Sequence, residues 1–166
     1  DEMSSRGLGD VYKRQHLDGS YHTITPEISM QIQRALGSDI IMAFDHCPPG
    51  KSELDEVTKA VKRTNEWFIR CKNYLKDNPS LYKHSQTLFP IIQGGINHKM
   101  REMSIEGLVP QADFGIAIGG LAVGEEKNAM LDTIEFCESL LPKDRPRYLM
   151  GVGRPTDIVK AVRLGV

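Results

Sequence analysis

Short apolar runs that end abruptly in small or polar residues recur along the chain, and a helical pattern follows each of them. The four runs are Ile40–Phe44, Leu88–Ile92, Phe114–Ile118 and Tyr148–Met150. Continuous apolar runs of this length are typical of strands buried on both faces. Strands that alternate with helices predict an α/β fold with a parallel sheet and right-handed crossovers.

The segments between the runs carry the usual helix signals. Thr25 and Pro26 predict a helix start, with Thr25 as N-cap, and Gly37 predicts its end. Ser52 with Asp55 resembles a capping box in front of a long amphipathic helix. Further helices are predicted up to about Gly107, over Glu125–Leu141 and over Thr156–Leu164.

The number of βα units does not decide the architecture. A closed barrel needs eight such units, whereas a doubly wound sheet forms from five or six, so four leave both open. Gly165 and Val166 resemble the approach to another strand. We therefore expect the chain to be a fragment of a longer protein.

The first fifteen residues, Asp1–Gln15, differ from the rest. They include MSSRGLGDVYKRQ, which has no sustained apolar period and is rich in Gly, Ser and basic residues. This segment is interpreted as translated sequencing adaptor; the alternative is a native, flexible arm. The remaining residues, 16–166, are expected to form one domain.

Composition removes several classes of function. With 40% hydrophobic and 26% charged residues, the chain is typical of a soluble globular protein. A net charge of −1 gives no global attraction for nucleic acid, so any RNA contact needs a local patch. No apolar stretch is long enough for a membrane span, and no signal peptide is visible. Cys47, Cys71 and Cys137 lack disulfide or zinc-knuckle spacing, which fits a cytoplasmic protein.

Polar residues at the strand ends are the candidate site, because parallel α/β enzymes bind substrate there. Asp45 ends the first run, and a guanine-like base would offer its carboxylate N1–H and N2–H2 side by side. Gln93 ends the second run, and its amide can donate to a purine O6 or N7. For each residue the alternative is an ordinary loop cap.

The other two strand ends add weaker signals. Gly119 and Gly120 expose backbone N–H groups suited to an anion or a carbonyl oxygen, without the spacing of a dinucleotide fingerprint. Met150 is a core residue or a thioether platform for a flat heterocycle. Gly153, Arg154 and Lys160 form a small basic edge that could touch phosphates, or a solvated helix face. His16, Asp18 and His22 are not grouped convincingly enough to predict a metal site.

Taken together and in this order, these residues resemble the tRNA-guanine transglycosylases. The resemblance runs from His16 to Val166 and includes HLDGSYHTITPE, LGSDIIMAFDHC, LFPIIQGG, IGGLAVGE and RYLMGVGRPTDIVKAVRLGV. It implies a TIM barrel with zinc-binding insertions, of which residues 16–166 would be a central part of about four βα units.

The resemblance also implies an activity. Members exchange guanine at the wobble position of tRNAs with a GUN anticodon for a 7-deazaguanine, in queuosine biosynthesis. An aspartate attacks C1′ and forms a covalent ribosyl-enzyme intermediate, so configuration is retained. The implied partners are tRNA and guanine or preQ1, with a homodimer when the protein is full length.

By motif match, the strand-end residues divide into roles. Asp45 reads the N1/N2 edge of the base, Gln93 and the Gly120 amide read the carbonyl side, and Met150 stacks on it. Gly119, Leu121 and Cys47 belong to the same expected substrate site. The expected tRNA contacts are Gly151, Val152, Gly153, Arg154, Pro155, Thr156 and Asp157. The base is expected to flip into the pocket.

Substrate choice depends on the loop GGLAVGE. Bacterial members that use preQ1 resemble this chain in having Val, here Val123, whereas queuine users have Gly. Glu125 is expected to help offset the cationic amine of preQ1. The resemblance therefore favours a bacterial-type enzyme.

Departures from the family limit what the chain is expected to do. The motif with a proton acceptor and an aromatic stacking partner would precede His16, and the nucleophile and zinc ligands would follow Val166. His46 stands where most members have Glu, and either alters the charge at the base site or points into solvent. We expect the chain as given to be inactive in guanine exchange. The alternatives are a non-catalytic tRNA-binding subunit and an unrelated phosphate-binding barrel enzyme.

Overall fold

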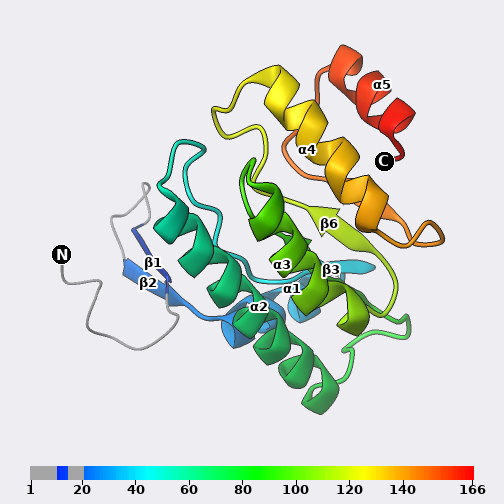
Figure 1. Ribbon diagram of the computed structural model, residues 1–166. Coiled ribbons are helices and arrows are strands. Elements are labelled where there is room, and N and C mark those ends of the chain that lie inside the picture. Colours follow the sequence, from blue (N-terminus) through cyan, green and yellow to red (C-terminus); the bar gives the residue numbers. More distant parts are fainter. Residues whose placement is uncertain (1–10, 15–20) are drawn as a thin grey trace.

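A computed structural model describes residues 11–14 and 21–166 of the chain (Figure 1). An antiparallel hairpin pairs β1 (Val11–Arg14) with β2 (Tyr21–Ile24). The sequence pattern did not predict the β2 strand. The interpretation of residues 1–15 as adaptor falls mostly outside the described residues and stays a prediction.

The remaining strands are parallel, as the sequence predicts. They are β3 (Ile40–Met42), β4 (Thr87–Phe89), β5 (Ile91–Ile92), β6 (Ile116–Ile118) and β7 (Arg147–Leu149). β3 pairs with β4, and β5, β6 and β7 follow one another in that order. The α/β class with parallel strands is therefore confirmed.

Pro90 divides the predicted strand Leu88–Ile92 into two. Proline has no N–H to donate to a ladder, so it interrupts regular pairing at that position. Its carbonyl still accepts from the Ala117 N–H, while the Phe89 carbonyl accepts from Ala43. The two halves thus pair with different strands: β4 pairs with β3, and β5 pairs with β6.

The helices are α1 (Pro26–Leu36), α2 (Leu54–Asp77), α3 (His98–Leu108), α4 (Lys127–Leu140) and α5 (Pro155–Leu164), with a 3-10 turn, η2 (Val109–Gln111), after α3. Each helix packs against the next one along the chain. Figure 1 shows α2, α3 and α4 side by side in front of the strands, with α5 beyond α4. The helices that cross between parallel strands therefore form one layer.

Local signals explain some helix ends and not others. The Thr25 hydroxyl accepts from the Ile28 N–H, and Gly37 ends α1 with φ +71°, as the sequence predicts. The predicted capping box at Ser52 and Asp55 is wrong, because the N-cap of α2 is Glu53 and no side chain caps it. Ser52 instead donates its N–H to the Pro49 carbonyl within a loop turn.

The core lies between the strands and this helical layer. One cluster joins β5 and β6 to α3 and α4 and includes Ile92, Ile116, Ile118, Ile134 and Cys137. A second joins β3 and β4 to α1 and α2 and includes Met30, Ile41, Phe68, Cys71 and Leu88. Phe114, predicted to begin a buried strand, lies before β6 and is 54% exposed.

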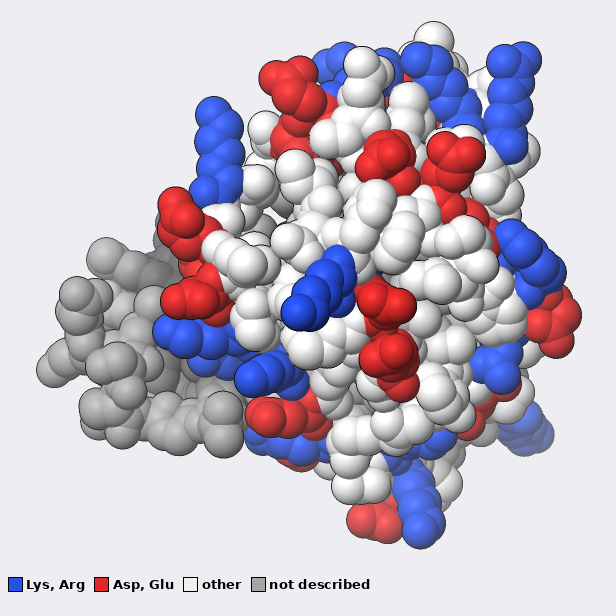
Figure 2. All heavy atoms as spheres, viewed as in Figure 1, with Lys and Arg blue, Asp and Glu red and all other residues white. Residues whose placement is uncertain are grey.

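The outer face of the helical layer is mixed in charge. Figure 2 shows Lys and Arg side chains interspersed with Asp and Glu over the face presented in Figure 1. This fits the near-zero net charge of the sequence. In the described part of the chain, none of the helices combines the length and the apolar character needed to cross a membrane.

Candidate functional site

The ends of four strand segments meet at one edge of the parallel strands. The Gln93 amide Nε2 donates to Asp45 Oδ2 at 2.6 Å, which joins two strand ends. A Cβ atom on Gly119 would lie 3.0 Å from Gln93 Nε2 and 3.5 Å from Met150 Sδ. The structure therefore brings Asp45, Gln93, Gly119 and Met150 together, as expected for the carboxyl ends of neighbouring parallel strands.

Glycine is required where the third strand ends. A Cβ on Gly120 would lie 2.3 Å from Gln93 Oε1, and the residue has φ +64°. Any other side chain here would collide with Gln93 and would strain the left-handed backbone, so only glycine fits without a large cost. Gly120 therefore places its backbone directly beside the Gln93 carboxamide.

Asp45 is half-buried, and its carboxylate accepts hydrogen bonds only from Gln93 and its own backbone among the described residues. Burial raises its pKa above the ordinary value, and the hydrogen bonds from Gln93 and from the backbone oppose that shift. A carboxylate in such a place gains stability from a ligand that brings further N–H donors. The arrangement suits a ligand edge with adjacent N–H groups.

Gln93 is fully buried, and only some of its polar atoms have hydrogen-bond partners among the described residues. Its backbone N–H donates to Ser104 Oγ at 3.1 Å. Its Nε2 carries a second N–H besides the one used by Asp45. Its Oε1 is buried and accepts no hydrogen bond from the described residues. The amide is therefore held in one orientation and keeps a spare donor.

Cys47 lies close enough to Asp45, Gln93 and Gly120 for each of them to act on its thiol. Burial raises the pKa of the Cys47 thiol, and the charge of Asp45 adds to that effect. The nearby Gln93 side chain and the Gly120 backbone N–H lower this pKa and so act in the opposite direction. The Gly120 N–H therefore faces the space beside Asp45 and Cys47.

The loop after Gly120 is held by the side chain of Glu125, which belongs to the same loop. The two carboxylate oxygens of Glu125 accept the N–H groups of Ala122 and Val123, the second at 2.9 Å. Ala122 has φ +58°, an unusual conformation for a residue with a side chain. Glu125 thus stabilises a strained loop.

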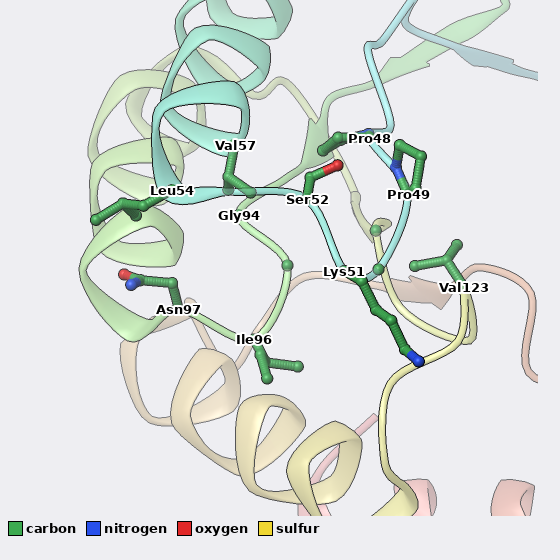
Figure 3. Close-up of a pocket in the computed structure, with 13 residues that line it drawn as sticks. Pro48, Pro49, Lys51, Ser52, Leu54, Val57, Gly94, Ile96, Asn97 and Val123 are labelled. Carbon is green, nitrogen blue, oxygen red and sulfur yellow. The ribbon is translucent and has the colours of Figure 1, made fainter.

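Val123 borders a cavity of about 250 Å³ next to Gly120 (Figure 3). Its other walls are the loop from Pro48 to Ser52, the start of α2, and the loop from Gly94 to Asn97. A Cβ on Gly50 would lie 2.8 Å from the Val123 carbonyl oxygen, so the two loops touch. The cavity adjoins the strand ends, and Asp45, Gln93 and Met150 are not among its walls.

A second cavity of about 390 Å³ follows β7. It is lined by residues 151–154 together with Asp157, Lys127 and Glu125. Lys127 forms an ion pair with Asp157, and this bond is the main cause that lowers the pKa of Asp157. The N-termini of α4 and α5 open here without side-chain caps. Arg154 is exposed at the same place.

His46 takes neither of the orientations considered from the sequence. Its ring lies 6.5 Å from that of Trp67 on α2, and its Nδ1 is 3.2 Å from Arg63 Nη1. Burial lowers the pKa of His46, and the Arg63 charge lowers it further. The imidazole is therefore half-buried against α2.

Sequence reasoning missed Arg101. This side chain is 0% exposed, and its guanidinium donates to four backbone carbonyls around the strand ends. A signal existed, because Arg101 shares the buried stripe of α3 with Ser104, Ile105 and Leu108. A charged residue on an apolar helix face indicates a specific buried partner.

Among the described residues, no group of three His, Cys, Asp or Glu side chains could hold a metal ion. His16 and Asp18 lie outside those residues. The described residues therefore offer no zinc site of their own, and the zinc ion implied by the resemblance stays an expectation.

Comparisons with known proteins agree on one family. The sequence model described as queuine tRNA-ribosyltransferase matches residues 5–166. Queuine tRNA-ribosyltransferase from Halothermothrix orenii is 50% identical over 156 residues, which is 94% of this chain and 40% of that protein. The Deinococcus radiodurans protein of that name is 46% identical over 95% of this chain and 38% of its own length.

A third relative extends the match. Queuine tRNA-ribosyltransferase from Ruegeria pomeroyi is 44% identical over 99% of this chain and 44% of its own length. The chain therefore spans about two fifths of the length of the curated relatives that it matches.

Proposed function

Because the chain belongs to the queuine tRNA-ribosyltransferase family, we propose that it supplies the base-recognition part of a tRNA-guanine transglycosylase. The complete enzyme exchanges guanine at the wobble position of tRNAs with a GUN anticodon for preQ1. The observation that carries this proposal is the convergence of Asp45, Gln93 and Gly120 at the strand ends.

Each group at the strand ends has a task that its chemistry supports. The Asp45 carboxylate accepts N1–H and N2–H2 of the base. The spare Gln93 N–H and the Gly120 N–H donate to its carbonyl side. Met150, whose sulfur borders Gly119, provides a polarizable surface for the ring.

The reaction in this proposal is a double displacement. An aspartate outside these residues attacks C1′ of the ribose, the bond to guanine breaks, and the incoming base then displaces the aspartate with net retention. The groups described above hold the leaving and the incoming base. By the family motif the nucleophile would follow Val166, and we propose that residues 1–166 alone do not exchange guanine.

A partial TIM barrel is the architecture that we propose. The parallel strands follow one another in chain order, and the helices between them form one layer. A doubly wound sheet instead reverses its strand order and covers both faces with helices. The observed winding supports a barrel segment of about four βα units.

We further propose that residues 151–157 contact the tRNA. Residues 151–154 and Asp157 border the second cavity, where two uncapped helix N-termini and Arg154 favour a phosphate. The target base flips out of the RNA to reach the strand ends. We also propose a cytoplasmic location, which the three free cysteine thiols support. The full-length protein is proposed to be a homodimer.

Val123 supports preQ1 as the incoming base. It stands at the cavity beside Gly120 and touches the loop at Gly50, which leaves little room for a bulky substituent. In the full-length enzyme, Val123→Gly should raise incorporation of queuine at least several-fold, and incorporation of guanine should change little. Mass spectrometry of the modified tRNA measures both. Equal queuine incorporation before and after the substitution would contradict the assignment.

The function itself is tested by exchange of labelled guanine into a GUN tRNA. The full-length protein should incorporate the label, and Asp45→Ala should reduce incorporation by a factor of 100 or more, on the order of two to three hydrogen bonds to a charged group. Asp144→Ala, in an exposed loop, is the matched control. Failure of the wild-type protein to exchange guanine would refute the proposal.

A further inference from the structure

Arg101 is a buried cation that contacts no carboxylate among the described residues. Its Nε donates to the Gly95 carbonyl at 2.8 Å and its Nη1 to the Ile92 carbonyl at 2.9 Å. Nη1 also donates to the Gly119 carbonyl at 2.7 Å, and Nη2 to the Gly120 carbonyl at 3.2 Å. One guanidinium thus binds the ends of β5 and β6 and the loop after β5.

A need for stability alone does not account for this charge. Burial lowers the pKa of Arg101, because removing a guanidinium from water disfavours its charged form. An apolar side chain of similar volume would avoid that cost. The four carbonyls gain instead a common partner that fixes their direction.

The direction of these carbonyls sets the direction of the next N–H groups. In a trans peptide the C=O and the following N–H point opposite ways. Arg101 holds the carbonyls of Gly119 and Gly120, so the N–H groups of Gly120 and Leu121 point away from the guanidinium. The Gly120 N–H lowers the pKa of the Cys47 thiol, which agrees with this direction.

We propose that Arg101 is a positioning residue that aims and polarises the Gly120 and Leu121 N–H groups toward the carbonyl oxygen of the bound base. The positive charge behind each carbonyl strengthens the N–H of the same peptide as a donor. This inference rests on the proposed function, since it names the source of the preference for a base with an oxygen at C6.

Arg34 is a matched control within the chain. It is also a buried arginine, 9% exposed, and its guanidinium donates to the Leu75 and Asn78 carbonyls and to Gln86 Oε1. It lies on α1, and its partners lie at the end of α2 and just before β4 rather than at the carboxyl ends of the strands. Loss of Arg34 removes comparable bonds and leaves the base site unchanged.

The test measures binding of two free bases to the full-length protein by calorimetry. Guanine has the C6 oxygen and N1–H, and 2-aminopurine lacks both, so the affinity of each base is compared only between wild type and variants. Arg101→Met should weaken guanine binding about tenfold and 2-aminopurine binding less than twofold, the scale of one lost hydrogen bond to the oxygen. Arg34→Met should change neither affinity, although both variants unfold at lower temperature.

Arg101→Lys provides a second variant that keeps a buried cation and reaches fewer carbonyls. It should show a partial loss of the guanine preference, and it carries the test if Arg101→Met does not fold. Equal weakening of both bases, or an equal effect of Arg34→Met, would overturn the positioning role alone. A wild-type protein that binds neither base would overturn the proposed function and this inference with it.

Discussion

At the scale of single residues, Asp45 is a carboxyl placed for a ligand rather than for stability. Its pKa is raised by burial, so its protonated form is favoured in the folded protein. The stability that it contributes is complete below the unfolded pKa of about 3.8 and is lost as the pH rises through the higher folded value. Ionised Asp45 therefore costs stability near neutral pH.

Asp45→Asn should accordingly stabilise the ligand-free protein at pH 7, by about 1 kcal/mol. The difference between variant and wild type should grow as the pH rises above 3.8 and then level off. Urea denaturation at a series of pH values measures it. Asp144→Asn, at an exposed position, should show no such growth. A pH-independent difference for Asp45→Asn would contradict the assigned cause.

Residue identity at the strand ends could be predicted from sequence, and the contacts could not. An abrupt change from apolar to polar marks Asp45 and Gln93 without any coordinates. That Gln93 donates to Asp45, or that His46 turns toward Arg63, depends on side-chain packing between distant segments. Arg101 shares the apolar stripe of α3, but its burial was not expected because arginines on helices usually lie at the surface.

At the scale of elements, α1 and α2 are joined by an ion pair. Arg70 donates two hydrogen bonds to the Glu27 carboxylate, at 2.7 and 2.6 Å. The hydrogen bond with Arg70 is the main reason that the pKa of Glu27 falls to about 2. Both side chains remain more than a third exposed, so solvent screening reduces the energy of the pair.

Glu27→Gln should therefore cost less than about 1 kcal/mol of unfolding free energy at pH 7. A depressed carboxyl pKa contributes stability above the unfolded value of 4.5, and that contribution is lost as the pH falls toward 2. Wild type and variant should thus converge in this range, as measured by urea denaturation. Glu66→Gln, exposed on α2, is the control. A gap that persists at pH 2 would argue against the pair.

A second pair joins α4 to β7 and is buried. Arg147 Nε lies 3.1 Å from both carboxylate oxygens of Glu138, and their side chains are 5% and 2% exposed. Removing one partner leaves a buried charge without compensation, which typically costs about 3–5 kcal/mol. The pair fixes the position of β7 relative to α4.

Arg147→Met should lower the unfolding free energy by about 3 kcal/mol or more, because it leaves the Glu138 charge buried without a partner. The double variant Glu138→Leu with Arg147→Met should recover most of the loss, because no buried charge remains. Thermal unfolding followed by circular dichroism compares them, with Arg163→Met on the exposed side of α5 as control. A double variant as unstable as Arg147→Met would show that the charge is not the cause.

Elements were more predictable than their ends. Thr25, Pro26 and Gly37 each carry a local signal, and α1 begins and ends where they indicate. The break at Pro90 required knowledge of which neighbour each half of the strand would face. The β2 strand was missed because its pairing partner, Val11–Arg14, lies in a segment without an apolar period.

At the scale of the whole molecule, apolar surface remains uncovered. Ile158, Val159 and Val162 on α5 are 45%, 52% and 60% exposed. Among the described strands, β3 and β7 each pair on one side only. Open edges and apolar stripes favour association between molecules.

Substituting the α5 stripe should raise the soluble fraction of this chain. Ile158→Lys with Val162→Glu should at least double the soluble yield with an unchanged circular dichroism spectrum, since both side chains contact water. Ala161→Lys, at a position 2% exposed, should unfold the helix and serves as the opposite control. An unaltered soluble fraction would show that the α5 stripe does not cause association.

The neighbour-to-neighbour packing of the helices also bears on how the molecule folds. Each βα unit contacts mainly the units that precede and follow it in the chain. A contact between units adjacent in the chain closes a shorter segment than a contact between distant units, so less entropy is lost at each step. Units of this kind can dock one after another during synthesis, in the order in which they leave the ribosome.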